Sequence, residues 1–237
     1  MKPEKEHLPF MGVGPVYVGG ILTLTAAAIF LSRAEKIPVA GAGALHAVFR
    51  EYRLKHKEVR KMLKRFFQNT RRPEGCGGGA NLAKLLAICP AGNVTGVDYS
   101  PVSVEASAKK NKRAVDAGHC HIVQGDVSAP PFKNATFDLA TAFETIYFWP
   151  DLENAFRQVL RVLRPGGSLI ICNQSDGINA ADGKWVRMID GMKIYKKEQL
   201  IELLKTAGFT GVTAYEKPKK HWLCITAIKA QSEETVQ

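Results

Sequence analysis

Glycines and carboxylates recur in this chain at points where a predicted strand gives way to a turn or a helix. The first such motif is the run Gly75–Cys76–Gly77–Gly78–Gly79, which directly precedes a predicted helix. Glycines at such a point let the backbone approach a ligand closely, and the free N–H groups at the start of a helix face that ligand. Taken alone, the run also fits a plain flexible turn.

Two carboxylates follow the next predicted strands. Asp98 ends a strand 19 residues beyond Gly79, where a carboxylate can accept both hydroxyl hydrogens of a ribose. Its alternative role is to cap the helix that begins at Pro101, which Ser100 can do instead. Asp126, in the turn Gly125–Asp126–Val127, could accept a hydrogen bond from an exocyclic amine such as that of adenine. A solitary Asp is, however, more often a turn residue.

Alternating helical and β-branched stretches must position these residues. From Gly75 onward the pattern predicts the α/β class, a Rossmann-like doubly wound and mostly parallel sheet that ends in an antiparallel strand pair. Ligands bind such a sheet at the carboxyl ends of its strands. The predicted helices are 80–89, 101–117, 152–163 and 197–207, and the predicted strands are 93–97, 121–124, 137–143, 168–172, 211–216 and 222–229.

Six motifs in a fixed order carry a family resemblance. GCGGG, GVDYS, QGDVSAPPF, FDLATAFETIYFWPD, LRVLRPGGSLII and LLKTAGFTGV together cover about residues 75–229. This set resembles the class I S-adenosylmethionine-dependent methyltransferases, particularly the small-molecule group with a generic methyltransferase domain. It argues against a nicotinamide dehydrogenase, whose loop is GxGxxG.

The resemblance implies S-adenosylmethionine as the cofactor and assigns roles to residues of these motifs. The glycine turn, with Cys76 inside it, would pass beside the methionine part, and Asp98 would hold the ribose hydroxyls. The remaining contacts implied are Tyr99 near the adenine, Asp126 and Val127 (after Gly125) on the adenine ring, and Phe143 beside the methionine moiety.

Methyl transfer from a sulfonium mainly requires that donor and acceptor are aligned and that water is excluded. A base is needed only when the acceptor must lose a proton. The candidates in the expected acceptor pocket are Glu144 and Tyr147, flanked by Trp149. Each of these is more often a packing or rim residue. The segment 175–195, which contains Trp185, could cover the acceptor.

The sequence departs from the family pattern at the first strand. The family has an apolar strand whose terminal acid, two positions before the first glycine, binds the amino group of the cofactor. Here Pro73 occupies that position, Glu74 is one residue out of register, and proline is unsuited to a central strand. We therefore expect this strand to be missing or degenerate, through loss of activity, through truncation or fusion of the gene product, or because another segment substitutes.

The amino-terminal region has the composition of a membrane attachment. No charged residue occurs from Leu8 to Ser32, and residues 11–31 are apolar over the length of a transmembrane helix. A buried core helix and a cleaved signal peptide are the alternatives. Residues 37–49 could form a re-entrant piece or a second span. The opening LPFMGVGPVYVGG faintly resembles the first membrane helices of isoprenylcysteine carboxyl methyltransferase-like proteins.

Charge and cysteine usage indicate which partners and which cellular compartment to expect. The formal net charge is +11, and residues 50–72 hold ten Lys or Arg against two Glu. This stretch predicts a basic amphipathic helix on an anionic membrane surface, or a solvated linker, and places the carboxy-terminal part in the cytoplasm. It lacks the interleaved aromatics of single-strand binders, which disfavours nucleic acid. Five scattered cysteines suit neither a disulfide scaffold nor a metal site.

Three regions are therefore expected, namely 1–49, 50–72 and 73–237. The leading hypothesis is a membrane-anchored enzyme that transfers methyl groups from S-adenosylmethionine to a small-molecule or lipid-like acceptor at the cytoplasmic membrane face. The alternative is a catalytically inactive, membrane-tethered protein with a binding or structural role.

Overall fold

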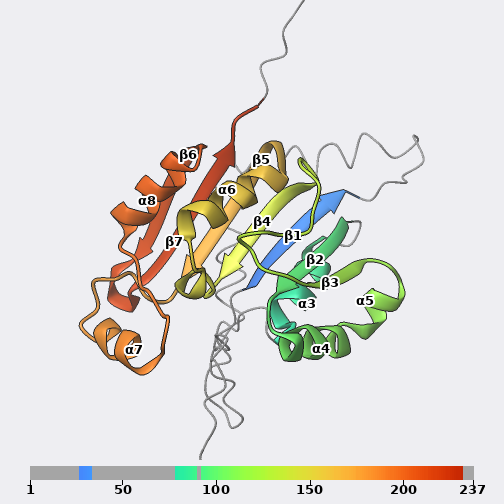
Figure 1. Cartoon of the computed structure of the whole chain (residues 1–237), viewed down its shortest axis with the longest axis horizontal. Coiled ribbons are helices and arrows are strands. Elements are labelled where there is room, and N and C mark those ends of the chain that lie inside the picture. The colour runs from blue at the N-terminus through green and yellow to red at the C-terminus, as the bar shows by residue number, and fades with distance from the viewer. Residues whose placement is uncertain (1–26, 34–77, 90–91, 232–237) are drawn as a thin grey trace, which may run out of the picture.

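The computed structural model describes residues 78–89 and 92–231, together with the backbone of residues 27–33. Strands and helices alternate along it (Figure 1). The elements are β1 (Ala27–Arg33), α3 (Ala80–Ile88), β2 (Gly92–Asp98), α4 (Pro101–Lys110), α5 (Lys112–Asp116), β3 (Cys120–Gln124), β4 (Phe137–Phe143), η3 (Ile146–Phe148), α6 (Leu152–Val162), β5 (Leu163–Asn173), α7 (Asp182–Met188), α8 (Lys197–Thr206), β6 (Phe209–Lys217), η4 (Pro218–Lys220) and β7 (Trp222–Lys229).

The seven strands form one sheet in the order β3-β2-β1-β4-β5-β7-β6. The pairs β2–β3 and β4–β5 are parallel, whereas β7 runs antiparallel to both β5 and β6. The predicted α/β class and the carboxy-terminal antiparallel pair are therefore confirmed. The carboxyl ends of β2, β3, β4 and β5 lie at one edge of the sheet, which we call the carboxyl edge.

The central strand that seemed to be missing is present, but a distant segment forms it in the reverse direction. β1 lies between β2 and β4 and is antiparallel to both. It runs from Ala27, opposite Asp98, to Arg33, opposite Gly92. Of the three explanations for the degenerate motif around Pro73, the structure thus shows substitution by another segment.

The same strand corrects the carboxyl end of the predicted membrane helix. Residues 27–31, expected at the end of a transmembrane helix, belong to β1. A short apolar run fits a buried strand as well as a helix, so its composition could not separate the two. Residues 11–26 and the predicted elements 37–49 and 50–72 lie outside the described residues. Within the described part, no helix has the length and apolar character needed to cross a membrane.

Two elements differ most from expectation, and both differ for local reasons. The helix expected over 101–117 is divided at Asn111, whose amide nitrogen donates to the carbonyls of Ser107 and Gly79 at 3.0 Å each. Such a side-chain bond to the backbone competes with the regular helix. β5 begins at Leu163 rather than at 168, and its register against β4 shifts so that residues 164–167 loop out.

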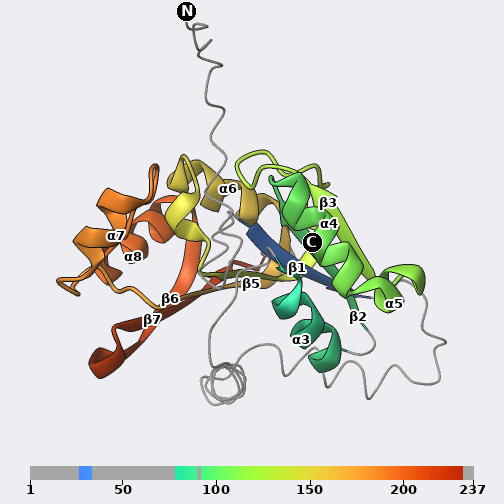
Figure 2. The same cartoon turned by 90° about the horizontal axis from the view of Figure 1, so that it is seen from below.

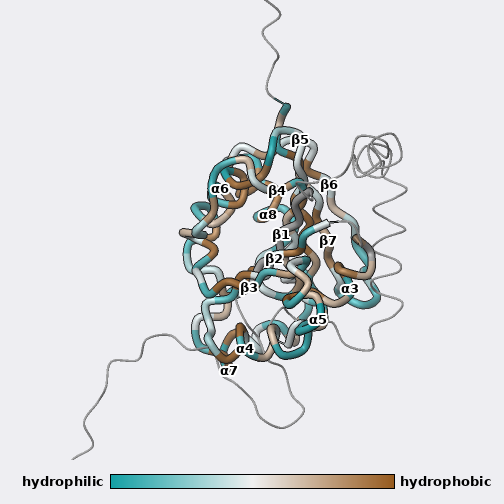
Figure 3. Tube along the Cα trace, turned by 90° about the vertical axis from the view of Figure 1, so that its right-hand side faces the viewer, coloured by the Kyte–Doolittle hydropathy of each residue, from teal (hydrophilic) through white to brown (hydrophobic). Residues whose placement is uncertain are grey.

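The sheet separates two apolar clusters (Figure 2). α3 packs on one face through Leu82 and Leu85, and α6 and α8 cover the other through residues such as Phe156 and Leu200. α6 begins where the Asp151 carboxylate accepts the N–H of Asn154 at 3.1 Å. Hydrophilic and hydrophobic stretches alternate along the helices in Figure 3, which is the pattern of helices that bury one face against a sheet.

Candidate functional site

The tip of β2 presents a buried carboxylate that does not serve as a helix cap. Asp98 is 1 % exposed, and its Oδ1 accepts the N–H of Ser100 at 2.9 Å. Ser100 itself caps α4, because its hydroxyl accepts the N–H of Ser103. The alternative reading of Asp98 as the N-cap is therefore wrong, and its carboxyl remains at the carboxyl edge.

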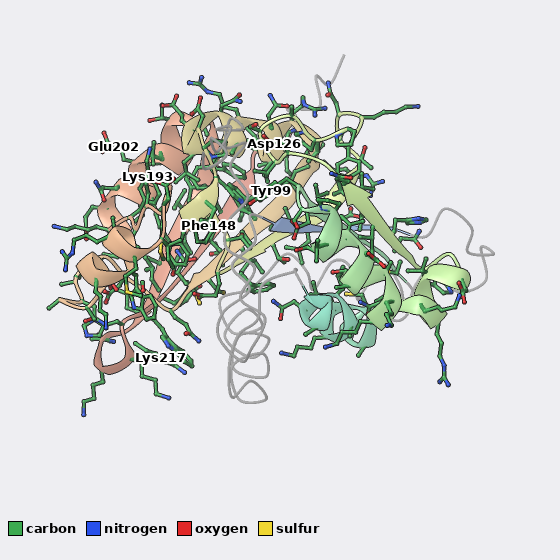
Figure 4. The ribbon with its side chains drawn as sticks, turned by 60° about the horizontal axis from the view of Figure 1, so that its bottom comes forward. Tyr99, Asp126, Phe148, Lys193, Glu202 and Lys217 are labelled. Atoms are coloured by element: carbon green, nitrogen blue, oxygen red, sulfur yellow. The ribbon has the colours of Figure 1, made fainter. Side chains whose placement is uncertain are left out.

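The tips of β2 and β3 are tied together by hydrogen bonds. The Gly125 N–H donates to the Asp98 carbonyl at 3.0 Å, and the Gln124 side chain donates to the Tyr99 carbonyl at 3.2 Å. This brings together the residues that the sequence assigned to the ribose and the adenine. Figure 4 shows Tyr99 and Asp126 in the middle of the molecule, in the same region as Phe148.

Asp126 and Val127 play different parts in that turn. The Asp126 side chain is exposed, and its Oδ1 accepts the N–H of Ser128 at 2.8 Å. Val127 is 3 % exposed and packs in the core with Ile146. The turn reading of Asp126 is thus correct, and its side chain remains exposed to solvent at the tip of β3.

The glycine turn enters α3 in a conformation that only glycine tolerates. Gly79 has φ +71°, and a Cβ there would lie 2.6 Å from the Asn111 amide nitrogen and 2.9 Å from the Ser107 Cα. A Cβ at Gly78 would meet nothing within 4 Å among the described residues. Gly75, Cys76 and Gly77 lie outside the described residues. Within the part of the chain that the structure describes, no side chain caps the start of α3, and N–H groups at such a start are common ligand-binding groups.

A buried acid follows β4. Glu144 has φ +57°, an uncommon conformation for a residue with a side chain, and its N–H donates to the Cys172 carbonyl at 3.0 Å. Burial raises the pKa of the Glu144 carboxyl to about 8, although a hydrogen bond from the Gln174 backbone opposes the shift. Strained backbone of this kind is found most often at functional sites.

Tyr147 connects Glu144 to the end of β5. Its hydroxyl lies 3.4 Å from the Glu144 carboxylate and accepts the N–H of Ser175 at 3.1 Å. Burial, followed by the Glu144 charge, raises the pKa of the Tyr147 hydroxyl well above its usual value. The structure therefore brings both predicted catalytic residues together at the carboxyl edge.

Two further residues of the sequence prediction belong to the core. Trp149 is 2 % exposed and packs edge-on against Phe156, with ring centroids 6.0 Å apart, so it does not flank an acceptor pocket. Phe143 is 4 % exposed and packs with Leu82 and Leu85 between the sheet and α3. Its side chain supports the site from beneath.

Sequence reasoning missed two buried polar residues at this edge. Asn173 ends β5 and Thr145 follows Glu144, and each is 1 % exposed. Neither the Asn173 amide nor the Thr145 hydroxyl has a hydrogen-bond partner among the described residues, and buried groups of this kind normally have one. The strand-end rule that identified Asp98 also applies to Asn173.

The reversed β1 changes the part of the site that a methionine moiety would occupy. Ala27, rather than an acid, stands beside Asp98 at the carboxyl edge, while the carboxyl end of β1 lies at the opposite edge. The described residues thus fit the nucleoside half of S-adenosylmethionine through Asp98, Tyr99 and Asp126. At the tip of β1 they place no carboxylate for its amino group.

Comparison with known proteins identifies this part of the chain. Residues 74–171 match the family described as "Methyltransferase domain". These residues therefore carry the sequence pattern of a methyltransferase domain. The methyl donor that such a domain uses is S-adenosylmethionine. The family match covers the glycine turn, both carboxylates and the Glu144–Tyr147 pair.

Relatives of the methyltransferase domain act on different molecules. The chain is 37 % identical to the O-methyltransferase cnsE of Penicillium expansum over 57 % of this chain and 50 % of the relative. It is 38 % identical to squalene methyltransferase 1 of Botryococcus braunii (39 % and 24 %), and 30 % identical to a demethylmenaquinone methyltransferase of Listeria welshimeri (73 % and 64 %). The chain thus spans a quarter to under two thirds of these relatives' lengths.

Solved structures share the fold of the methyltransferase domain. An S-adenosylmethionine-dependent methyltransferase of Thermotoga maritima superposes with a TM-score of 0.52 at 21 % identity, over 81 % of this chain and 95 % of that one. The [4+2]-cyclase SpnF superposes with a TM-score of 0.52 at 20 % identity, over 67 % and 73 %. At these identities the likeness concerns the fold, and the activity must be argued from the site.

Proposed function

We propose that this protein transfers the methyl group of S-adenosylmethionine to a small, largely apolar acceptor whose reacting atom must lose a proton. The observation that carries this choice of acceptor is the buried Glu144 carboxyl beside the Tyr147 hydroxyl. An acceptor that reacts without losing a proton has no use for a buried acid–phenol pair. Relatives named for squalene and demethylmenaquinone support an apolar, lipid-like acceptor.

The residues of this chain would divide the work between binding and proton removal. Asp98 and Asp126 bind the nucleoside and thereby fix the position of the donor. When bound, S-adenosylmethionine supplies an electrophilic methyl group on a sulfonium. The ionised Glu144 takes the proton from the acceptor atom, and Tyr147, held by the Ser175 N–H, keeps the carboxylate oriented.

The proposal places this reaction at the cytoplasmic face of a membrane. Residues 8–26 carry no charged side chain, and the Lys- and Arg-rich stretch 50–72 follows. This order of segments supports an amino-terminal attachment with the methyltransferase domain in the cytoplasm. Fractionation of cells that express the full chain tests it: release of the protein by high salt alone would contradict an apolar anchor.

A second function is favoured by the reversed β1. Without an acid at the tip of that strand, the fold could bind a partner or serve a structural role and perform no methyl transfer. The two functions differ in one measurement, the heat of S-adenosylmethionine binding to the folded protein. A titration without heat favours the inactive, membrane-tethered protein.

The enzyme proposal is tested with S-adenosylmethionine labelled in its methyl group. Asp98→Ala and the milder Asp98→Asn should both abolish measurable binding, whereas Lys109→Ala, which changes an exposed side chain on α4, should leave it intact. Label should pass to a phenolic or other acidic acceptor with the native chain. Binding that survives both Asp98 changes would contradict the assignment of the site.

A further inference from the structure

We propose that the carboxyl edge of the sheet docks on an anionic lipid bilayer. The contact is a surface formed by residues 178–190, which include α7, and by residues 217–222 of the β6–β7 turn; we call it the α7 surface. Its role in acceptor delivery rests on the proposed function, but its binding to lipid does not. This surface is distinct from the amino-terminal segments in which the sequence predicted a membrane attachment.

Exposed apolar side chains gather in the first part of this surface. The described residues expose six large hydrophobic side chains, and four of them fall within residues 178–188. Their exposed fractions are 66 % for Ile178, 37 % for Trp185, 42 % for Val186 and 62 % for Met188. Single exposed apolar residues are ordinary, but a cluster around a short helix indicates an interaction site. Trp is also a side chain that favours the membrane–water interface.

Positive charge surrounds these apolar residues. Five exposed cations belong to the α7 surface, and Asp190 is its one exposed acid. The Lys217 and Lys220 ammonium groups lie 5.3 and 4.9 Å from the centre of the Trp222 ring. A surface that exposes both apolar side chains and cations suits an anionic bilayer, whereas a nucleic acid would leave the apolar part without a partner. The cations are Lys184, Arg187, Lys217, Lys219 and Lys220.

Polar contacts hold the two parts of the α7 surface on the same edge. His221 Nδ1 lies 3.1 Å from Asp176 Oδ2 and so joins the β6–β7 turn to the segment after β5. The Asp182 carboxylate, at the start of α7, accepts the N–H of Gly177 at 3.1 Å. In Figure 1 the turn and α7 both lie at the lower left. Figure 4 shows Lys217 at the lower edge of the molecule.

Strand register places this surface next to the catalytic edge. Asn173, the last residue of β5, pairs with Leu223, the second residue of β7, so the β6–β7 turn stands at the carboxyl edge. Ala27 pairs with Asp98, so the chain before β1 joins the domain at that edge too. The charge-free residues 8–26 immediately precede it. A bilayer against the α7 surface would thus lie on the side from which an apolar acceptor reaches Glu144.

The test uses tryptophan fluorescence of the full chain on vesicles with brominated acyl chains, which quench tryptophans that enter the bilayer. The vesicles are phosphatidylcholine alone or phosphatidylcholine mixed with phosphatidylglycerol. The chain has three tryptophans, and the difference between the native protein and Trp185→Phe isolates Trp185. We expect Trp185 to be quenched on the mixed vesicles and much less on phosphatidylcholine.

Matched variants separate this surface from other attachments. Met188→Asp should remove the quenching of Trp185, whereas Val102→Asp, at an equally exposed site on α4, should not. Replacing Lys219 and Lys220 by Glu should weaken the quenched complex by about tenfold or more, since each cation near the bilayer contributes about 1 kcal/mol. Vesicles that bind the protein without quenching Trp185, or that fail to bind it, overturn the proposal.

The outcomes also separate this inference from the proposed function. If Trp185 is quenched in a protein that transfers no methyl group, the docking surface is supported and the enzyme proposal is contradicted. If the protein transfers methyl groups to a soluble acceptor and Trp185 is unquenched on every vesicle, the enzyme proposal is supported and the docking surface is contradicted.

Discussion

Ala27 lies opposite Asp98, at the carboxyl edge of a central strand that runs in the reverse direction. The pairing gives the sheet its central strand without giving the site the acid that a parallel strand would end with. The two carboxylates proposed for the nucleoside half of the cofactor are present, whereas β1 contributes none for the methionine half. Binding of the donor should therefore depend mainly on its adenosine part.

Donor analogues test that division. We expect S-adenosylmethionine and 5′-methylthioadenosine, which lacks the amino-acid part, to bind with dissociation constants within about tenfold of each other, because β1 contains no acid for the amino group. A charged hydrogen bond there, worth roughly 1.5–3 kcal/mol, would separate the two by more than tenfold. Asp98→Asn should abolish the measurable calorimetric binding of both. Far tighter binding of S-adenosylmethionine would show that residues outside the described ranges hold its amino group.

The pH dependence of folding should reveal the buried Glu144. Its pKa is about 8 in the folded protein against 4.5 for an ordinary glutamate, so the folded state holds a proton that the unfolded state releases. The associated stability is fully present below pH 4.5 and declines as pH rises to about 8. Glu144→Gln should remove this decline, gaining on the order of a few kcal/mol at pH 8 and little at pH 4.5. Denaturant titrations at the two pH values measure this gain in the free energy of unfolding. Equal gains at both pH values would contradict the burial of this charge.

The same carboxyl should control the rate of methyl transfer. Only the ionised Glu144 can accept a proton, so kcat should rise with pH and level off above about 8. Glu144→Gln should lower kcat by roughly 100-fold or more and abolish this rise, a typical loss for a general base. Tyr147→Phe should keep most of the activity but shift the pH at which kcat reaches half of its maximum, because the phenol contacts the Glu144 carboxyl. A flat profile in the native protein would leave Glu144 without a catalytic role.

Several features of this fold could be predicted because they depend on neighbouring residues. The strand 137–143 and the helix start at Pro101 were predicted at their observed positions, since alternation and capping are local signals. The origin of β1 was not predictable, because a short and mostly apolar run fits a helix as well as a strand. Only pairing with β2 and β4 decides its conformation. At the site, Asp98 was predicted from its place at the end of a strand, and it ends β2 in the structure. The core position of Trp149 depends on α6 packing, which the sequence does not reveal.

Glycine substitutions separate backbone strain from steric conflict at the entrance to α3. Gly79 and Gly118 have φ of +71° and +75°, but a Cβ would meet close atoms only at Gly79. Gly118→Ala should therefore cost about 1 kcal/mol of folding free energy for the left-handed backbone alone. Gly79→Ala should cost clearly more, because the Asn111 amide that bonds to the Gly79 carbonyl must move. Gly78→Ala, with open space at its Cβ, is the control for the turn itself. Chemical denaturation of the three variants gives the order of their losses in folding free energy. Equal losses at Gly79 and Gly118 would mean that the Asn111 side chain moves aside without a loss of folding free energy.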